Sequence, residues 1–235
     1  MKIFELKDIW YFAIAAVLCY LMGCFNFAVL IARFKKKNIR EMGSGNPGTM
    51  NITRSLGLKF GVLNFFCDGI KGGIPVLAGY FIFQNYVFAG TSISVSDFAR
   101  YFFGLFVIIG HIFPVTMRFK GGKGIASTMG IFAFALACER WWYFFIVVAF
   151  FVCIFLYIYF TEWGSMGSLL GVTVLTVFQA AIFAERYADS LLNGWSISIF
   201  VILFVVNVLT WGAHGKNIFR LLAGEEHRTV VRKHK

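Results

Sequence analysis

Seven runs of mostly apolar residues constrain the fold of this chain more than any other feature. A helix needs about 20 apolar residues to cross the hydrocarbon core of a bilayer. The chain is 59% apolar and only 14% charged, whereas soluble domains are about 45–50% apolar and about 25% charged. We therefore predict an all-α polytopic membrane protein with one membrane domain over residues 1–235. The expected spans are about 10–32, 60–83, 99–117, 125–139, 141–161, 164–184 and 195–213.

The distribution of Lys and Arg predicts how these spans are oriented. Cytoplasmic loops collect Lys and Arg, so we place the N-terminus outside and the C-terminus in the cytoplasm. This orientation also explains the net charge of +11 without a nucleic-acid partner. Lys71 stays within a span, and Lys2, Lys7, Arg100, Arg140 and Arg186 fall outside. The inner segments then hold Arg33, Lys35, Lys36, Lys37, Arg40, Arg54, Lys59, Arg118, Lys120, Lys123, Lys216, Arg220, Arg228, Arg232, Lys233 and Lys235.

A polar, glycine-rich loop, Gly43–Arg54, interrupts the apolar runs on the expected inner side. Three glycines and a proline within its first six residues disfavour a helix and permit positive φ angles. Backbone N–H groups in such a loop can converge on an anion, and an arginine suits phosphate. The residues expected to contact a substrate here are Ser44, Gly45, Asn46, Gly48, Thr49, Asn51 and Arg54.

A second loop, Phe119–Gly124, repeats this pattern with lysines and contributes Lys120, Gly121, Gly122 and Lys123. Neither loop has the context of a nucleotide site. The first matches G-x-G-x-x-G, but a membrane span precedes it where a dinucleotide site needs a strand. The second lacks the glycine spacing of a Walker loop. We therefore expect the two loops to meet at one membrane face and to hold phosphate-bearing substrates.

Asp68, Lys71 and His111 lie well inside predicted spans, where ionisable groups are costly and turn inward. His111 is either a packed core residue or a general base or donor to a substrate oxygen. Asp68 and Lys71 are three residues apart and share a helix face. They form either a structural ion pair or an arrangement in which Lys71 binds an anion that Asp68 orients. Pro114 is predicted to kink the third span and to free carbonyl groups near the second loop.

The tail after the last span carries His214 and Asn217, which share one face of a predicted short helix with Leu221. Its basic residues suit a helix lying on anionic lipid, but His214 and Asn217 suit a face turned toward the site. Ser165 and Ser168 begin the sixth span on the same side. These two serines either allow close helix packing or contact substrate.

Taken together, these motifs resemble the bacterial acylphosphate:glycerol-3-phosphate acyltransferases, the PlsY family, over nearly the whole chain. The matching blocks are Gly43–Arg54, Asp68–Gly72, Gly110–Gly124 and His214–Gly224, in the family's order. The resemblance implies transfer of an acyl group from acyl phosphate to the 1-hydroxyl of sn-glycerol 3-phosphate. The products would be lysophosphatidic acid and inorganic phosphate, with no cofactor and no metal. It also implies the bacterial cytoplasmic membrane, and the distribution of Lys and Arg places the active site on the cytoplasmic side.

The same resemblance assigns roles to individual residues. Glycerol 3-phosphate would be held by Arg54, Lys123, Ser44, His214 and Asn217, with help from Ser165 or Ser168, and the first loop would hold the phosphate of the acyl donor. We take Ser44, Asn46, His111, Lys123 and His214 as candidate catalytic residues. The chain departs from the usual family pattern at Thr49-Met50, where Ala-Thr is usual, and mildly at Glu225-Glu226.

An acyl phosphate has a good leaving group, so catalysis can rest on positioning two anions and stabilising developing charge. The proton acceptor is open among His111, His214, Asp68 and the phosphate of the substrate, and we favour the substrate. We expect a monomer in the bilayer that binds acyl phosphate and glycerol 3-phosphate. The alternative is a transporter or channel for a phosphate-containing anion, which the absence of an inverted repeat disfavours.

Overall fold

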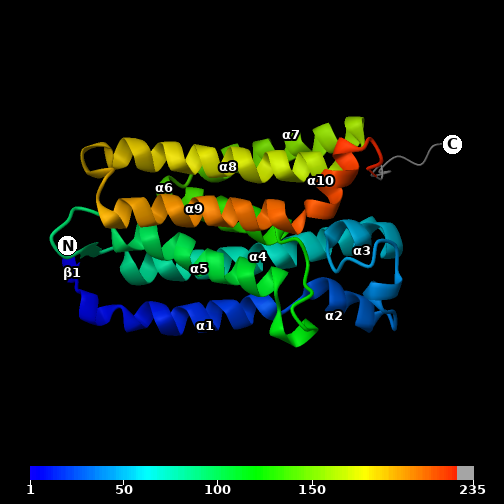
Figure 1. The fold of residues 1–235 in the computed structure, drawn as a ribbon, viewed down its shortest axis with the longest axis horizontal. Coiled ribbons are helices and arrows are strands. Elements are labelled where there is room, and N and C mark those ends of the chain that lie inside the picture. The colour runs from blue at the N-terminus through cyan, green and yellow to red at the C-terminus, as the bar shows by residue number, and fades with distance from the viewer. Residues whose placement is uncertain (227–235) are drawn as a thin grey trace.

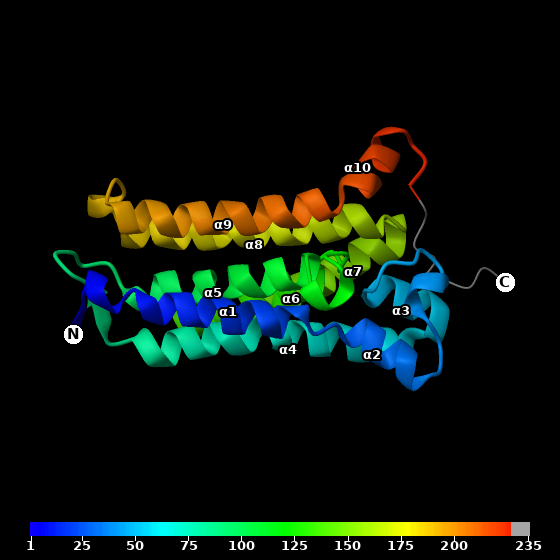
Figure 2. The same cartoon turned by 60° about the horizontal axis from the view of Figure 1, so that its bottom comes forward.

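The computed structural model describes residues 1–226, and the basic residues Arg228, Arg232, Lys233 and Lys235 lie outside this range. It is a bundle of long helices that run side by side (Figures 1 and 2). Within residues 1–226, six segments are long and apolar enough to cross a membrane, and α6 is apolar but shorter. Helices are found at all seven predicted ranges. They are α1 (Trp10–Cys24), α4 (Leu58–Phe83), α5 (Val95–Ile112), α6 (Ile125–Glu139), α7 (Tyr143–Thr161), α8 (Gly164–Arg186) and α9 (Gly194–Ala213).

The shorter elements gather at the two ends of this bundle (Figure 1). One end, called the loop end here, carries α2 (Phe27–Phe34), α3 (Thr49–Leu56) and α10 (Gly215–Leu222), with 3₁₀ turns at Ile39–Glu41 and Val115–Met117. The opposite end carries β1 (Lys2–Phe4), which pairs in parallel with β2 (Tyr86–Phe88) so that Lys2 faces Tyr86. It also carries 3₁₀ turns at Leu6–Asp8 and Ala188–Ser190.

The first predicted span, 10–32, is two helices rather than one. The backbone is extended at Phe25 and Asn26, and the side chain of Asn26 accepts a hydrogen bond from the Val29 N–H at 2.9 Å. Asparagine offers the backbone this alternative to a continuous helix. The break leaves carbonyl groups at the end of α1 without partners in their own helix, and these carbonyls take part in the site described below.

The prediction that Gly43–Arg54 is a loop throughout is wrong from Thr49 onward, where α3 begins. The glycines and the proline occupy only positions 43–48, and Gly48 is the N-cap of the helix. Nothing in the remaining residues opposes a helix strongly enough to prevent one. Arg54 is therefore presented from the last turn of a short helix.

The predicted kink at Pro114 is also wrong, because α5 ends before it, at Ile112. The residue before a proline is biased away from helical conformation, and Phe113 has left it, with ψ at 57°. The carbonyls of His111 and Ile112 are nevertheless used by the second loop, as the sequence suggested. They accept hydrogen bonds from the N–H groups of Gly122 at 3.1 Å and Gly121 at 2.9 Å.

Glycines allow the helices to approach one another closely. A Cβ atom placed on Gly110 of α5 would lie 2.1 Å from the Tyr20 carbonyl oxygen of α1, and one on Gly130 of α6 would lie 2.0 Å from the Gly69 oxygen of α4. Lipid gives no hydrophobic driving force between helices, so van der Waals contact across such small residues holds membrane bundles together. α5 contacts α1, α4, α6 and α9, and thereby occupies the centre of the bundle.

Candidate active site

The two glycine-rich loops touch at Gly122. A Cβ atom at this position would lie 2.4 Å from His111 Nε2 and 3.1 Å from the Pro47 carbonyl oxygen, and one at Gly121 would lie 2.0 Å from the His111 oxygen. Neither position has space for a side chain, so both must be glycine. The sequence pattern predicted that their N–H groups would bind an anion. In the structure these N–H groups donate to carbonyl oxygens at the end of α5, so they are not available to one.

The first loop is shaped by Asn51, which is buried at the start of α3. Its Oδ1 accepts the Ser44 N–H at 3.0 Å, and its Nδ2 donates to the carbonyl oxygens of Met42 at 2.9 Å and Ile39 at 3.4 Å. Both amide hydrogens are therefore used inside the loop. We interpret Asn51 as a residue that holds the loop in shape rather than one that contacts substrate.

The N–H donors available to an anion come from the first turns of two helices. α3 begins after Gly48 and α6 after Gly124, and neither N-cap provides a side-chain hydrogen bond. Within residues 1–226 no backbone acceptor meets the N–H groups of Thr49, Met50 and Asn51, or those of Ile125, Ala126 and Ser127. The first turn of a helix attracts anions through such N–H groups and through the helix dipole.

Beneath the loops lies a buried polar cluster around Lys71. Its Nζ is 3.2 Å from Asp68 Oδ1 and 2.9 Å from His111 Nδ1. It also donates to the carbonyl oxygens of Phe25 at 2.8 Å and Gly23 at 3.3 Å. The break after α1 leaves these two carbonyls without helical partners. The predicted pair of Asp68 and Lys71 is thus present. A lysine ammonium only donates hydrogen bonds, so His111 Nδ1 accepts, and the imidazole proton sits on Nε2 beside Gly122.

A residue that the sequence analysis missed connects this cluster to the first loop. The Asn64 side chain is fully buried, and its Nδ2 donates both to Asp68 Oδ2 and to the Thr49 hydroxyl oxygen, each at 2.9 Å. Because the Thr49 oxygen accepts this bond, its own proton is left to donate elsewhere. Thr49 is one half of the departure from the usual family pattern.

A third group forms where α10 packs beside the start of α8. Lys123 Nζ donates to Asn217 Oδ1, and Asn217 Nδ2 donates to the Ser165 oxygen at 2.8 Å. The Glu226 carboxylate accepts hydrogen bonds from Ser165, from Asn217 at 2.7 Å and from Arg220 at 3.0 Å. Ser168 is outside this group, because its hydroxyl donates to the Gly164 carbonyl one turn earlier in α8.

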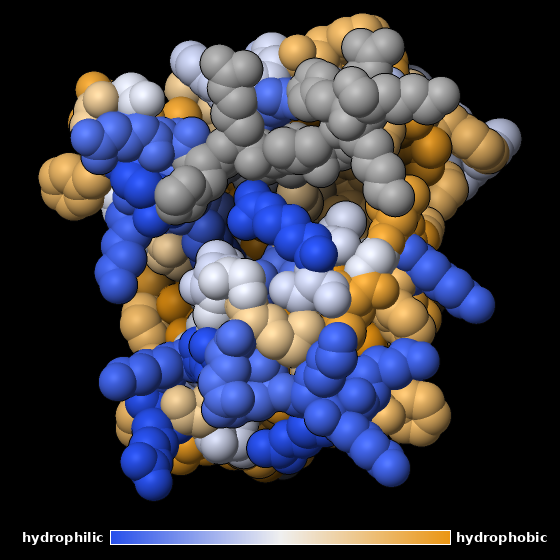
Figure 3. All heavy atoms as spheres, turned by 90° about the vertical axis from the view of Figure 1, so that its right-hand side faces the viewer, coloured by the Kyte–Doolittle hydropathy of each residue, from blue (hydrophilic) through white to orange (hydrophobic). Residues whose placement is uncertain are grey.

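The electrostatics of the group centre on Lys123. The pKa of Lys123 is lowered to about 8: burial lowers it most, the charge of Glu226 opposes this, and the charges of Arg220 and Arg54 add to the lowering. Arg54 therefore acts on Lys123 although 69 positions separate them in the sequence. Lys120 is exposed, and its carbonyl oxygen accepts a hydrogen bond from Arg40. Figure 3 shows the hydrophilic side chains gathered on this end of the molecule.

His214 closes the group at the end of α9. It is buried, and its Nδ1 donates to the Thr210 carbonyl oxygen at 2.8 Å, which leaves Nε2 as an acceptor. Burial, with the charge of Lys123, lowers the pKa of His214 to about 4. The imidazole is therefore neutral near pH 7 and is a weak base.

The structure brings most predicted residues to the loop end but connects them through partners that the sequence did not reveal. Asn64, Arg220 and Glu226 had no recognised role. Glu226 was noted only as part of a mild departure, and Arg220 as a lipid-facing charge. Two features of the sequence could have indicated these residues. Glu226 is a carboxylate that follows a basic helix, and Asn64 is a polar residue one helical turn before Asp68.

Comparison with known proteins shows which family the chain belongs to. The sequence profile described as glycerol-3-phosphate acyltransferase matches residues 13–224. The chain belongs to this family. A glycerol-3-phosphate acyltransferase of Aquifex aeolicus is 34% identical over 212 residues, covering 90% of this chain and 96% of the relative. One of Mycoplasma pneumoniae is 30% identical over 233 residues, covering 91% and 92%.

Two solved structures agree with this membership in the glycerol-3-phosphate acyltransferase family. The crystal structure of PlsY, an integral membrane glycerol 3-phosphate acyltransferase, in its glycerol 3-phosphate form has a TM-score of 0.70 and 29% identity, and the match covers 93% of this chain and 95% of that one. The lysophosphatidic acid form gives a TM-score of 0.69. The chain is thus a multi-pass membrane acyltransferase.

Proposed function

We propose that this acyltransferase moves an acyl group from acyl phosphate to the 1-hydroxyl of glycerol 3-phosphate. The hydroxyl oxygen attacks the acyl carbon, the bond from that carbon to the phosphate oxygen breaks, and lysophosphatidic acid and inorganic phosphate leave. We further propose that the enzyme is a monomer in a bacterial cytoplasmic membrane and that the loop end faces the cytoplasm.

The observation that carries this proposal is the convergence of two anion-binding elements at one end of the bundle. Lys123, within electrostatic range of Arg54, is linked to Asn217 and Ser165, which suits the phosphate and hydroxyl groups of glycerol 3-phosphate. The N–H groups in the first turn of α3, which begins at Thr49, suit the phosphate of the acyl donor. Gly122, which touches both His111 and Pro47, lies between them.

The same geometry supports the substrate as the proton acceptor. Asp68 is buried and ion-paired with Lys71, and the Nδ1 lone pair of His111 accepts from Lys71, so neither residue is well placed to take a proton from the substrate. His214 can accept a hydrogen bond from a hydroxyl group, but a pKa of about 4 makes it a poor base. The hydroxyl proton then goes to the departing phosphate, which leaves as hydrogen phosphate and balances the reaction.

The reaction is tested with the purified chain in detergent, where no second compartment exists. Palmitoyl phosphate and labelled glycerol 3-phosphate should yield labelled lysophosphatidic acid and one phosphate per product. Lys123→Ala and Arg54→Ala should raise KM for glycerol 3-phosphate about tenfold or more, because a hydrogen bond to a charged group contributes about 1.5–3 kcal/mol. Lys216→Ala, which removes an exposed lysine of α10, serves as the control.

Each alternative gives a different result. Product from an acyl thioester instead of acyl phosphate would overturn the assigned donor. No product from either donor, together with glycerol 3-phosphate uptake into proteoliposomes, would favour a transporter. Loss of turnover with normal substrate binding in His214→Ala would show that His214 takes the proton, contrary to the substrate-assisted route.

A further inference from the structure

A cationic hollow lies at the loop end, apart from the groups that form the candidate active site. Its volume is about 430 Å³. It opens between α2, the segment after α2, and the turn Val115–Met117 that precedes the second glycine loop. None of Lys123, Ser165, His214 and Asn217 lines it. The lining residues are Val29, Arg33, Lys37, Asn38, Ile39, Arg40, Thr116, Met117 and Arg118.

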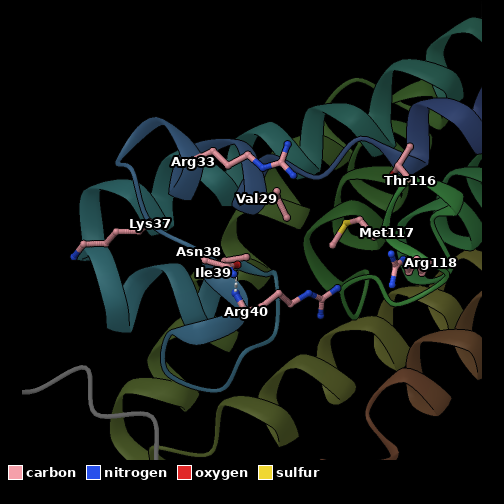
Figure 4. A pocket seen from close by; sticks show the side chains of 9 residues that line it. All are labelled: Val29, Arg33, Lys37, Asn38, Ile39, Arg40, Thr116, Met117 and Arg118. Atoms are coloured by element: carbon pink, nitrogen blue, oxygen red, sulfur yellow. Dashed lines mark hydrogen bonds between the residues drawn. The ribbon is translucent and has the colours of Figure 1, made fainter.

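The charge of this hollow is of one sign. In Figure 4 the guanidinium groups of Arg33, Arg40 and Arg118 surround it, and Lys37 points away. The lining contains no Asp or Glu. The neighbouring Glu41 accepts a hydrogen bond from Asn38 at 2.6 Å, and within residues 1–226 none of the three arginines forms an ion pair. Guanidinium groups gathered without a carboxylate match the oxygen atoms of a phosphate group.

The backbone around Arg118 is held in an unusual conformation. Arg118 and Phe119 both have positive φ angles, 52° and 59°, which non-glycine residues rarely adopt. Hydrogen bonds from their N–H groups to Val115 and Pro114 maintain this turn. Arg40 donates to the Lys120 carbonyl oxygen, so the hollow and the second glycine loop share a wall.

The surroundings of the hollow are apolar, which indicates where its ligand resides. Leu30 and Phe34 of α2 and Phe119 are exposed, Phe34 to 85%, and α2 belongs to the first candidate span. Side chains of this kind at the end of a span lie at the level where the bilayer meets water. Inside the hollow, Val29, Ile39 and Met117 add apolar contacts.

We propose that this hollow binds the phosphate headgroup of an anionic membrane lipid, with the acyl chain lying along Leu30 and Phe34 of α2. Basic pockets between membrane helices recognise lipid headgroups in this way. The site would be a second phosphate site, lined by residues that precede the second glycine loop and not by Lys123. The proposal does not depend on the proposed reaction, because binding alone tests it.

Native mass spectrometry of the full chain in a neutral detergent provides the test. The protein is titrated with phosphatidylglycerol, lysophosphatidic acid, phosphatidylcholine and, separately, inorganic phosphate. The titration with lysophosphatidic acid uses a Lys123→Gln background, so that the candidate active site contributes little. The wild type should retain one anionic lipid and little phosphatidylcholine. Stronger binding of lysophosphatidic acid than of phosphatidylglycerol would identify the headgroup as a phosphomonoester.

The double variant Arg33→Gln/Arg118→Gln should bind the anionic lipid about tenfold or more weakly, since it loses two charge-assisted partners. Lys36→Gln/Lys59→Gln removes the same charge from exposed residues of the loop end that do not line the hollow, and should bind as the wild type does. All four residues are exposed, and thermal unfolding in detergent checks that each variant is folded. Equal loss in both double variants, unchanged binding in the arginine variant, or binding of inorganic phosphate alone would overturn the proposal.

Discussion

Lys123 is the residue whose ionisation state decides how well the site holds an anion. Its pKa is lowered to about 8 chiefly by burial, with Glu226 acting in the opposite direction and Arg220 and Arg54 adding to the lowering. If the charged form binds phosphate as proposed, kcat/KM for glycerol 3-phosphate should be full below pH 8 and should fall as the pH rises through this value. Lys123→Arg should remove the decline, because arginine keeps its charge beyond pH 12.

Initial rates between pH 6.5 and 9.5 at saturating acyl phosphate measure this effect. Lys216→Arg, on the exposed face of α10, should keep the profile of the wild type. A wild-type profile that stays flat to pH 9.5, or a decline that persists in Lys123→Arg, would show that another group titrates.

Asn64 should act on the reaction through the hydroxyl of Thr49. Asn64→Leu and Thr49→Val should each raise KM for acyl phosphate about three- to tenfold, because each removes one hydrogen bond to an anion or the residue that orients it. The double variant should be no worse than the more affected single variant, and Thr49→Ser should retain the activity. Thr53→Val is the control, since the Thr53 hydroxyl donates only to a carbonyl of its own helix. Additive effects would mean that the two residues act independently.

The residue types of the site could be predicted from the sequence, but several of their roles could not. Gly121 and Gly122 were expected to donate N–H groups to an anion. The partners of those N–H groups depend on where α5 ends, which Phe113 and Pro114 decide. Asn51 and Asn46 have the same polar side chain. Only the folded loop shows that Asn51 is buried and that its amide donates hydrogen bonds to the carbonyl oxygens of Met42 and Ile39.

Among the elements, the pairing of α4 with α6 positions both loops, because α6 begins where the second loop ends. Gly130→Ala should destabilise this pair by about 1–3 kcal/mol, since the new Cβ would lie 2.0 Å from the Gly69 oxygen. Gly212→Ala in α9, where the added Cβ would meet nothing within 4 Å beyond its chain neighbours and the backbone of its own helix, should be neutral or stabilising by up to about 1 kcal/mol. Thermal unfolding in detergent compares the two. Equal effects would contradict the packing argument.

The helices themselves were largely predictable, because long apolar runs admit few other structures in a bilayer. The ranges 125–139 and 195–213 coincide with α6 and α9 to within one residue at each end. What the apolar pattern could not reveal is the break between α1 and α2, since Asn26 is a single polar amide in an otherwise apolar run. That break depends on Asn26 capping α2 and on Lys71 binding the carbonyls it frees.

At the scale of the whole molecule, the two ends of the bundle differ in how far their cations are paired with carboxylates. The end opposite the loops contains the buried Arg100 and the partly exposed Arg186, which pair with the buried carboxylates of Asp97 and Glu139 in a group of balanced charge. Two of the five cations counted as outer are therefore neutralised by the protein. At the loop end Lys71 pairs with Asp68 and Arg220 with Glu226, but Arg33, Arg40 and Arg118 form no ion pair within residues 1–226. An anion pathway would use cations at both ends, so this asymmetry favours an enzyme with one site.

The same asymmetry predicts the orientation of the chain in the membrane. Ser92, exposed before α5 at the end opposite the loops, should lie outside, and Lys37, exposed after α2, should lie in the cytoplasm. In intact cells an impermeant maleimide should label Ser92→Cys, whereas Lys37→Cys should react only after permeabilisation. The wild type corrects for its own cysteines, of which only Cys153 is exposed in residues 1–226. Labelling of Lys37→Cys from outside would reverse the orientation and would place the candidate active site away from cytoplasmic glycerol 3-phosphate.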